Sequence, residues 1–327
     1  MKYILISLSA LFLFTACSSK KYFEPEDVSS KIELNKESMP SSIVSMNKIG
    51  ATLEDGEIIN EKGISSFKLP EGFSFLNVSS DGKVIATNRI NKILIGDKER
   101  VTKDVVVAAS LKDNKLALVY SNDTLELIDI NTNKTLFKDY QPISLANDTR
   151  ITNPYFMGNL ILFPTLNGKI IIVSALNNEV VKNISVDPDK EFNNIISLNV
   201  IESSQTLIVA SPNKIVSISP KEVISKDYEV RDLIVKNDDI YLATIDGQII
   251  KLNANLAEIA KKKYKYAKIH ALAYSNSLYA VESQGFLINL NQDLSDDNIY
   301  KFSFDNEERM IAIGNKIYFD SKYITLP

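Results

Sequence analysis

Pairs of short apolar segments recur along most of the chain, and a turn rich in Asn, Asp or Gly separates the two members of each pair. In the clearest copy, residues 160–163 precede the turn Asn167-Gly168 and residues 170–173 follow it. Five other pairs follow the same plan: 83–87 with 91–95, 116–120 with 123–127, 206–209 with 215–218, 240–243 with 249–252, and 278–281 with 287–290. Because Asn-Gly and Asp-Gly provide the positive φ angles of tight hairpins, each pair is predicted to form two antiparallel β-strands.

The apolar segments are continuous rather than alternating, as in residues 170–173, so these strands are expected to be buried on both faces. Polar stretches follow the second strand at 129–133, 253–256 and 291–294, which predicts a further hairpin turn in each copy. The turns recur every 32 to 45 residues, close to the length of one propeller blade. The repeating unit is therefore predicted to be a four-stranded antiparallel blade.

Six such units fit within residues 71–304, and the tail supplies two strands of another at 310–313 and 316–319. The strands missing from that last blade are expected within 43–69, so that the two ends of the chain close the ring and leave no open edge. We predict an all-β fold, a single β-propeller of about seven four-stranded blades, within a range of six to eight, over residues 42–327. A β-sandwich pair, a β-helix and a transmembrane barrel are less favoured alternatives.

The first 16 residues have the order of a secretory signal peptide: Lys2, an apolar run, and the small residues Thr15-Ala16. The segment Phe14-Thr15-Ala16-Cys17 resembles the lipobox of bacterial lipoproteins, in which the cysteine carries acyl chains such as palmitate and begins the mature chain. The alternative is a cysteine that merely follows an ordinary signal peptide. Ser18 after this cysteine implies the outer membrane, by analogy with lipoprotein sorting. Residues 17–41 are predicted to be the lipidated Cys17 and a flexible tether.

The amino-acid composition excludes several classes of protein and of functional site, but it does not identify one. The chain is 45% hydrophobic and 24% charged, which excludes a disordered chain and a polytopic membrane protein. With 37 basic and 41 acidic residues, the net charge of −4 argues against nucleic-acid binding. One Cys, one His and no Trp exclude a disulfide framework, a Cys/His metal cluster and any Ser-His-Asp site that lacks His270.

No catalytic, cofactor-binding or metal site is predicted, and the protein is not expected to be an enzyme. His270 is placed on an innermost strand near the propeller channel, where a structural role is favoured over a catalytic one. The lysine run at 261–266 is interpreted as a solvated outer strand, with contact to anionic lipid as the alternative. Asp187, Asp189, Glu191, Asp238 and Asp239 are assigned to connections between blades, since they do not form a calcium-loop pattern.

The signal peptide, the lipobox and the repeat of apolar strand, Asn/Asp-Gly turn and apolar strand together resemble the PQQ-like β-propeller lipoproteins. The stretches 168–173, 247–253 and 131–134 are most similar to that family's Gly-x-(Leu/Ile)-(Tyr/Phe)-Ala-Leu-Asp and Thr-Gly-Lys motifs. The tryptophans that stack between blades in many members are absent here. The metal cluster and the ring-stacking platform of the family's quinone-dependent dehydrogenases cannot be built from these residues.

This resemblance implies a non-catalytic, lipid-anchored scaffold in the periplasm, a monomeric subunit that binds the outer-membrane β-barrel assembly machinery or other envelope proteins through its propeller loops. The alternative is a surface-exposed lipoprotein that binds an external host protein or glycan. A third hypothesis is an enzyme that uses His270 in the channel. The long connections at 141–153 and 186–194 are the candidate partner-binding loops.

Overall fold

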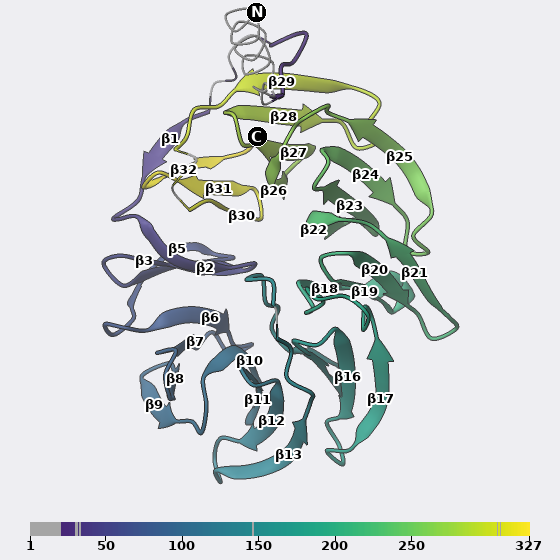
Figure 1. The fold of residues 1–327 in the computed structure, drawn as a ribbon. Coiled ribbons are helices and arrows are strands. Elements are labelled where there is room, and N and C mark those ends of the chain that lie inside the picture. Colours follow the sequence, from purple (N-terminus) through teal and green to yellow (C-terminus); the bar gives the residue numbers. More distant parts are fainter. Residues whose placement is uncertain (1–20, 30–31, 33, 146, 306, 308) are drawn as a thin grey trace, which may run out of the picture.

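The computed structural model describes residues 21–327 except 30, 31, 33, 146, 306 and 308. Its strands form eight separate four-stranded antiparallel sheets, which are arranged around a ring as the blades of a propeller (Figure 1). The signal sequence predicted at 1–16 and the acylation site predicted at Cys17 lie outside the described residues.

The first four blades cover the chain from Ile43 to Ser185. Their strands are β2 (Ile43–Asn47), β3 (Gly50–Leu53), β4 (Glu57–Asn60) and β5 (Gly63–Lys68) in blade 1; β6 (Ser74–Val78), β7 (Val84–Thr87), β8 (Lys92–Ile95) and β9 (Lys98–Val101) in blade 2; β10 (Val106–Lys112), β11 (Lys115–Tyr120), β12 (Thr124–Asp129) and β13 (Lys134–Tyr140) in blade 3; and β14 (Tyr155–Met157), β15 (Leu160–Pro164), β16 (Lys169–Ser174) and β17 (Val180–Ser185) in blade 4.

Blades 5 to 8 complete the ring. Their strands are β18 (Ser197–Ile201), β19 (Thr206–Ala210), β20 (Lys214–Ile218) and β21 (Val223–Asp227) in blade 5, with the short 3-10 helix η1 (Glu202–Ser204); β22 (Val230–Lys236), β23 (Asp239–Thr244), β24 (Gln248–Leu252) and β25 (Glu258–Lys263) in blade 6; β26 (Ile269–Tyr274), β27 (Leu278–Glu282), β28 (Phe286–Leu290) and β29 (Asp297–Lys301) in blade 7; and β30 (Ile311–Ile313), β31 (Lys316–Phe319), β32 (Lys322–Thr325) and β1 (Lys36–Ser38) in blade 8.

The six predicted hairpins are confirmed as the second and third strands of blades 2 to 7. These strands are buried on both faces because each blade packs against a neighbour on either side. Between blades 4 and 5, for example, Leu162 and Ile172 share one apolar cluster with Val209 and Val216. The core therefore consists of layers between blades, filled mainly by Ile, Leu, Val and Ala with Phe and Tyr in several layers, in a chain that has no Trp.

The eight blades lie within the predicted range of six to eight and are one more than the favoured number of seven. Residues 43–69, from which strands were expected to complete the last blade, instead form all four strands of blade 1. The tail supplies three strands rather than two, because the turn at Asp320 and Ser321 leads into β32. Both turn residues adopt positive φ angles without a glycine, so the usual turn signal is missing from the sequence.

The two ends of the chain close the ring, as predicted, although with other strands. β1 pairs with β32, with Glu37 opposite Tyr323, and forms the outer strand of blade 8. The propeller thus begins at Lys36 rather than at residue 42, and part of the predicted tether belongs to the fold. Phe23 and Met39 in the same stretch are also buried, against blades 6 and 7 and against blades 1 and 8 respectively.

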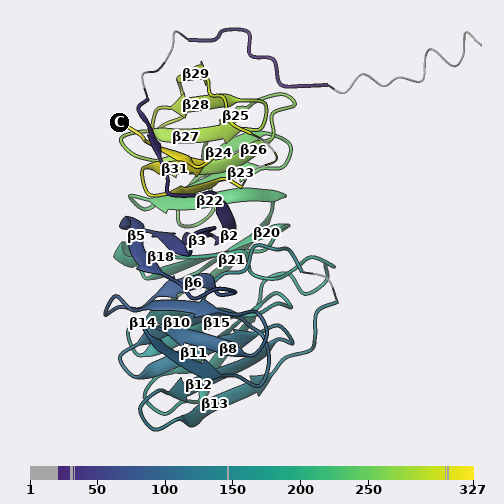
Figure 2. The ribbon, with the colours of Figure 1, turned by 90° about the vertical axis from the view of Figure 1, so that its left-hand side faces the viewer.

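The strand order assigns each connection to one of the two faces of the ring. The first strands of neighbouring blades, such as β22 and β26, contact each other and surround the centre. Because successive strands are antiparallel, the connection from one blade to the next lies on the same face as the turn between the second and third strands. Seen from the side, the strands run from one face of the ring to the other (Figure 2).

Candidate protein-binding face

Six connections join the consecutive blades 1 to 7, and two of them are much longer than the other four. Residues 141–154 join blade 3 to blade 4, and residues 186–196 join blade 4 to blade 5. Both lie on the same face of the propeller by the rule above, and we call them together the long-loop face. The positions suggested from the sequence, 141–153 and 186–194, fall within these two connections.

Asn194 holds the two connections together. Its amide nitrogen donates hydrogen bonds to the carbonyls of Arg150, at 2.8 Å, and Asp148, at 3.2 Å. Its amide oxygen accepts a hydrogen bond from the backbone nitrogen of Asp148 at 2.6 Å. The backbone nitrogen of Thr152 also donates to the carbonyl of Ile195, at 3.4 Å. One buried asparagine therefore fixes one connection to the other.

Arg150 attaches the first of these connections to blade 6. Its guanidinium donates hydrogen bonds to the carbonyls of Val230, at 3.0 Å, and Arg231, at 2.7 Å, and forms an ion pair with Asp148 at 2.6 Å. Burial would raise the pKa of the Asp148 carboxyl, but the hydrogen bonds from Arg150 outweigh burial and lower that pKa. Figure 1 shows the teal connection after β13 reaching the centre of the ring.

Asn153 anchors the end of the first connection to the innermost strands. Its side chain donates to the carbonyl of Leu76 at 2.9 Å and accepts from the backbone nitrogen of Ala109 at 3.0 Å. The Ser110 hydroxyl donates to the carbonyl of Pro154 at 2.5 Å. The connection is therefore attached to blades 2, 3 and 6, and its position over the ring is defined.

Apolar side chains project from this braced surface. Leu145 is fully exposed, at 101% of its reference area, while Ile143 is 68% exposed and Phe192 is 49% exposed. The side chain of Asn167 donates to the carbonyl of Pro142, beside Ile143, at 3.1 Å. The backbone carbonyl of Asn167 accepts from Asn193, beside Phe192, at 3.3 Å. One turn of blade 4 therefore positions both parts of the apolar surface.

Buried polar atoms without partners also gather here. Of the four such side-chain atoms in the described part of the chain, Asn147 Oδ1 and Asn193 Oδ1 belong to the long-loop face. Asp123 Oδ2 lies directly beneath it, since the carbonyl of Asp123 accepts a hydrogen bond from the backbone nitrogen of Gln141. Burial raises the pKa of the Asp123 carboxyl to about 6, against the lowering effect of its hydrogen bonds from Leu166 and Asn167. Buried polar atoms are usually paired, so this concentration marks an unusual surface.

His270 lies on β26, the innermost strand of blade 7, as predicted. Its ring meets Phe304 edge-on at 5.9 Å, and burial together with the charge of Arg231 lowers its pKa. Within the described residues its side chain makes no hydrogen bond, so no acid–base pair forms around it there. Nor do three or more Cys, His, Asp and Glu residues gather as a metal site within the described ranges.

The acidic residues singled out in the sequence fall into two groups. Asp187, Asp189 and Glu191 lie on the connection between blades 4 and 5, as predicted, and the buried carboxylate of Asp187 accepts a hydrogen bond from Ser211 at 2.9 Å. Asp238 and Asp239 instead lie at the hairpin between β22 and β23, inside blade 6, so their assignment to a connection between blades was wrong. Asp239 forms an ion pair with Lys251 at 2.7 Å.

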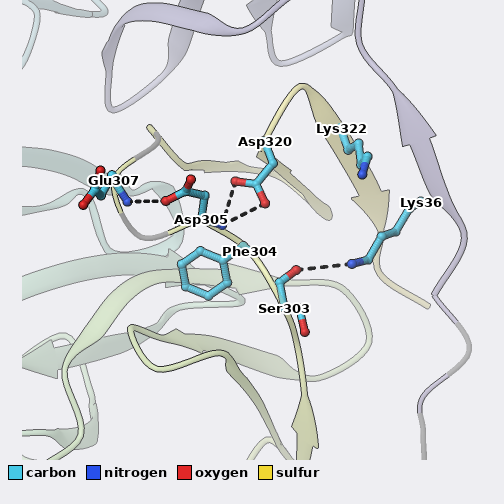
Figure 3. A pocket seen from close by; sticks show the side chains of 7 residues that line it. All are labelled: Lys36, Ser303, Phe304, Asp305, Glu307, Asp320 and Lys322. Atoms are coloured by element: carbon cyan, nitrogen blue, oxygen red, sulfur yellow. Dashed lines mark hydrogen bonds between the residues drawn. The ribbon is translucent and has the colours of Figure 1, made fainter.

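A hollow at the seam between blades 7 and 8 has a structural explanation (Figure 3). The carboxylate of Asp320 accepts hydrogen bonds from the backbone nitrogen of Asp305 at 2.8 and 2.9 Å. On the other side, the Lys36 ammonium donates to the carbonyl of Ser303 at 3.2 Å. These contacts connect the ring-closing strands to the end of blade 7. In the part of the chain that the structure describes, no helix is long and apolar enough to cross a membrane.

The fold defines the class of the protein as an eight-bladed β-propeller, and its architecture is similar to that of BamB. BamB from Moraxella catarrhalis superposes with a TM-score of 0.66 over 91% of this chain and 99% of its own, at 12% identity. Sqt1 from Saccharomyces cerevisiae superposes with a TM-score of 0.62 over 92% of this chain and 99% of its own, at 10% identity. At these identities the likeness concerns the fold alone.

Sequence comparison points to particular proteins. The chain is 27% identical to the plasminogen-binding protein PgbB of Helicobacter pylori strain J99 over 385 aligned positions, which cover 99% of this chain and 71% of PgbB. PgbB from strain 26695 is also 27% identical, over 99% of this chain and 70% of its own length. No family model matches the chain.

Proposed function

We propose that this protein is a non-catalytic, protein-binding propeller of the bacterial envelope, anchored to a bilayer through acyl chains on Cys17, and that its partner docks on the long-loop face. The observation that carries this proposal is the apolar surface of Ile143, Leu145 and Phe192, held exposed on two connections that are fixed to each other and to blade 6. Exposed apolar groups on a pre-organised surface favour binding to another protein, since little conformational entropy is lost on association.

The first candidate partner is an external protein. Similarity to proteins named for plasminogen binding extends over 99% of this chain, so plasminogen is the first ligand to test. In this case the propeller is displayed outside the outer membrane. This was the alternative hypothesis from the sequence, and the sequence relatives favour it.

The second candidate partner is the outer-membrane β-barrel assembly machinery. The propeller architecture shared with BamB supports it, but at 12% identity that likeness extends only to the fold. In this case the propeller lies in the periplasm. The external protein is tested before the assembly machinery because sequence similarity to the plasminogen-binding proteins extends along 99% of this chain.

A binding role accounts for the described residues better than catalysis does. The only histidine has a lowered pKa and no hydrogen-bond partner among the described residues. The bracing on the long-loop face uses amide and guanidinium groups that bind backbone carbonyls, as at Asn194 and Arg150. Such contacts stabilise loop geometry rather than activate a nucleophile.

The direct test is a binding assay with matched triple variants of residues 18–327, which contain every strand and the segment docked through Phe23. The test variant carries Ile143→Ser, Leu145→Ser and Phe192→Ser. The control carries Leu176→Ser, Val181→Ser and Val223→Ser, three exposed apolar residues outside the long-loop face. Immobilised plasminogen is the first probe, and crosslinking with affinity purification from cells is the second.

We expect the test variant to lose at least about tenfold in affinity, while the control binds as the original chain does. Equal binding by both variants, to plasminogen and to any crosslinked partner, would overturn the proposal. Protease treatment of intact cells separates the two candidates, because a surface propeller is digested and a periplasmic one is protected. Loss of metabolic palmitate labelling in Cys17→Ala tests the anchor.

A further inference from the structure

The segment that follows the proposed anchor is docked on the outside of the propeller. Phe23 is only 6% exposed and meets the rings of Tyr264 and Phe286 edge-on, at 6.0 and 5.5 Å between centroids. Six residues later, the backbone nitrogen of Ser29 donates to the carbonyl of Ile299 at 2.8 Å. In Figure 2 the purple segment runs along the outer edge of blade 7, beyond β29. The chain therefore leaves the propeller at a defined place, the rim of blades 6 and 7.

Lysines gather at this rim. Lys265 and Lys268 lie on the connection from β25 to β26, and Lys301 ends β29. Lys21 lies over the Tyr266 ring at 5.5 Å, and Lys265 lies over the same ring at 5.2 Å. Lys21 and Lys265 thus share one exposed aromatic ring, and Lys268 and Lys301 lie on the same two blades. We call the surface made by these five residues the lysine corner.

Four lysines of the lysine corner, Lys21, Lys265, Lys268 and Lys301, have no carboxylate within ion-pair distance among the described residues. The three neighbouring lysines on β25 do form ion pairs. Lys261, Lys262 and Lys263 pair with Glu258, Asp297 and Asp246 respectively. The acids Glu24, Glu26 and Asp27 follow Phe23 along blade 7, on the way to Ser29. The lysines without an ion pair among the described residues thus lie where the chain reaches the rim, and the three acids lie further along blade 7.

Exposed tyrosines accompany these lysines. Tyr22 precedes the docked Phe23 and is exposed, and Tyr266 is exposed between the two lysines that lie over its ring. Tyrosine is enriched at membrane interfaces because its ring is apolar and its hydroxyl remains hydrated. Lysine near a membrane surface is attracted to anionic headgroups. The combination is suited to a bilayer surface. It differs in chemistry from the apolar residues of the long-loop face, although the β25–β26 connection opens on the same side of the ring.

We propose that the lysine corner binds the anionic headgroups of the bilayer and so sets the orientation of the propeller on the membrane. This inference rests on the proposed acylation of Cys17. Cys17 precedes Phe23 by six residues, and six residues reach about 20 Å at full extension. The bilayer is therefore within about 20 Å of the docked Phe23, close to the lysine corner.

The orientation has a consequence for partner binding. Blades 3 and 4, which carry the ends of the 141–154 connection, lie at the opposite end of the ring from β28 and β29 (Figure 1). A propeller that rests on the rim of blades 6 and 7 holds blades 3 and 4 away from the bilayer. The apolar residues of the long-loop face are then accessible to a large protein.

The test uses unacylated residues 18–327, so that its result does not depend on the modification of Cys17. Co-sedimentation is measured with vesicles of phosphatidylglycerol mixed with phosphatidylcholine, and with phosphatidylcholine alone. The test variant carries Lys265→Gln, Lys268→Gln and Lys301→Gln. The control carries Lys98→Gln, Lys134→Gln and Lys182→Gln, three exposed lysines on blades 2, 3 and 4 that remove the same charge.

We expect the original chain and the control to bind the phosphatidylglycerol vesicles in low salt, and the test variant to bind them at least about tenfold more weakly. Binding should disappear in high salt and on phosphatidylcholine alone. Equal binding by the two variants, or no binding of the original chain, would overturn this inference and leave the partner assay unaffected. A failed partner assay with normal vesicle binding would overturn only the proposed partner.

Discussion

The guanidinium of Arg150, on the connection from blade 3 to blade 4, donates a hydrogen bond to the backbone carbonyl of Arg231 on blade 6, 2.7 Å away. Blade 6 lies two blades beyond blade 4, and the connection that carries Arg150 meets it near the centre of the ring (Figure 1). Because Arg150 also binds Asp148, one side chain couples the shape of the long-loop face to blade 6.

Arg150→Ala should weaken partner binding while the propeller stays folded. The connection loses its attachment to blade 6, and the apolar residues it carries must then be ordered on binding. We expect a loss of about 1–2 kcal/mol in binding free energy, roughly fivefold to thirtyfold in affinity. Arg100→Ala is the control, since Arg100 binds the carbonyl of Ile130 between blades 2 and 3. Equal effects of the two substitutions on binding would contradict this role of Arg150.

Gly168→Ala should disturb the second connection. Gly168 has a φ of +80°, and an added Cβ would lie 2.9 Å from the carbonyl oxygens of Asp187 and Asn193. The alanine must shift the 186–196 connection, at a cost of about 1–3 kcal/mol in stability. Gly82→Ala has a similar φ of +85° but open space around the Cβ, so it separates backbone strain from the clash. Thermal unfolding and partner binding should both be affected more by Gly168→Ala, and the reverse order would contradict the packing argument.

Asp123→Asn should change how stability depends on pH. The folded-state pKa of Asp123 is raised to about 6 from 3.8, so the folded protein holds this proton more tightly than the unfolded chain. The original protein therefore loses stability as pH rises from about 4 through 6, on the order of 2–3 kcal/mol in all. Asparagine keeps the acceptor for the Leu166 backbone nitrogen and tolerates the φ of +59°.

We expect Asp123→Asn to match the original protein near pH 4 and to be the more stable of the two above pH 7, by chemical denaturation. Asp113→Asn is the control, because Asp113 is an exposed turn residue of the same blade with a φ of +55°. If the difference between Asp123→Asn and the original protein stayed constant from pH 4 to 8, the buried carboxyl would not be the cause.

Phe23→Ala should release the docked segment without unfolding the ring. Phe23 packs on the outside of blades 6 and 7, and its segment contributes no strand before β1. Hydrogen exchange of residues 21–29 should therefore become faster, while the strands of blade 7 keep their protection. Tyr22→Ala is the matched control, since the Tyr22 side chain is exposed. Unchanged exchange in Phe23→Ala would show that the edge-on ring contacts do not hold the segment.

Most of the propeller could be predicted because each hairpin of blades 2 to 7 has its own local signals. Continuous apolar strands such as 170–173, with Asn-Gly or Asp-Gly turns, indicate buried antiparallel pairs independently of the rest of the chain. The favoured count of seven was one short of the eight blades because such signals are missing from the last blade. The turn at Asp320 and Ser321 has no glycine, and β1 has only three exposed residues, so only pairing with β32 reveals it.

The candidate site was predictable in position but not in structure. The length of the two connections is visible in the sequence, and both were proposed as partner-binding loops. The hydrogen bonds from Asn194 to Arg150 and from Arg150 to Arg231 join residues that are far apart in the chain. No local pattern marks them. The same holds for Phe23, which has the appearance of a tether residue until Tyr264 and Phe286 are brought beside it.

Site-specific photocrosslinking on cells shows which face of the propeller meets its partner. A photoreactive amino acid replaces Leu145 on the long-loop face or Leu176 at the hairpin between β16 and β17, on the other face; these leucines are 101% and 75% exposed. Cells carrying each variant are irradiated with plasminogen present and absent. We expect a protein adduct from position 145, to plasminogen or to an envelope protein, and none from position 176. Adducts from position 176 alone would contradict this expectation.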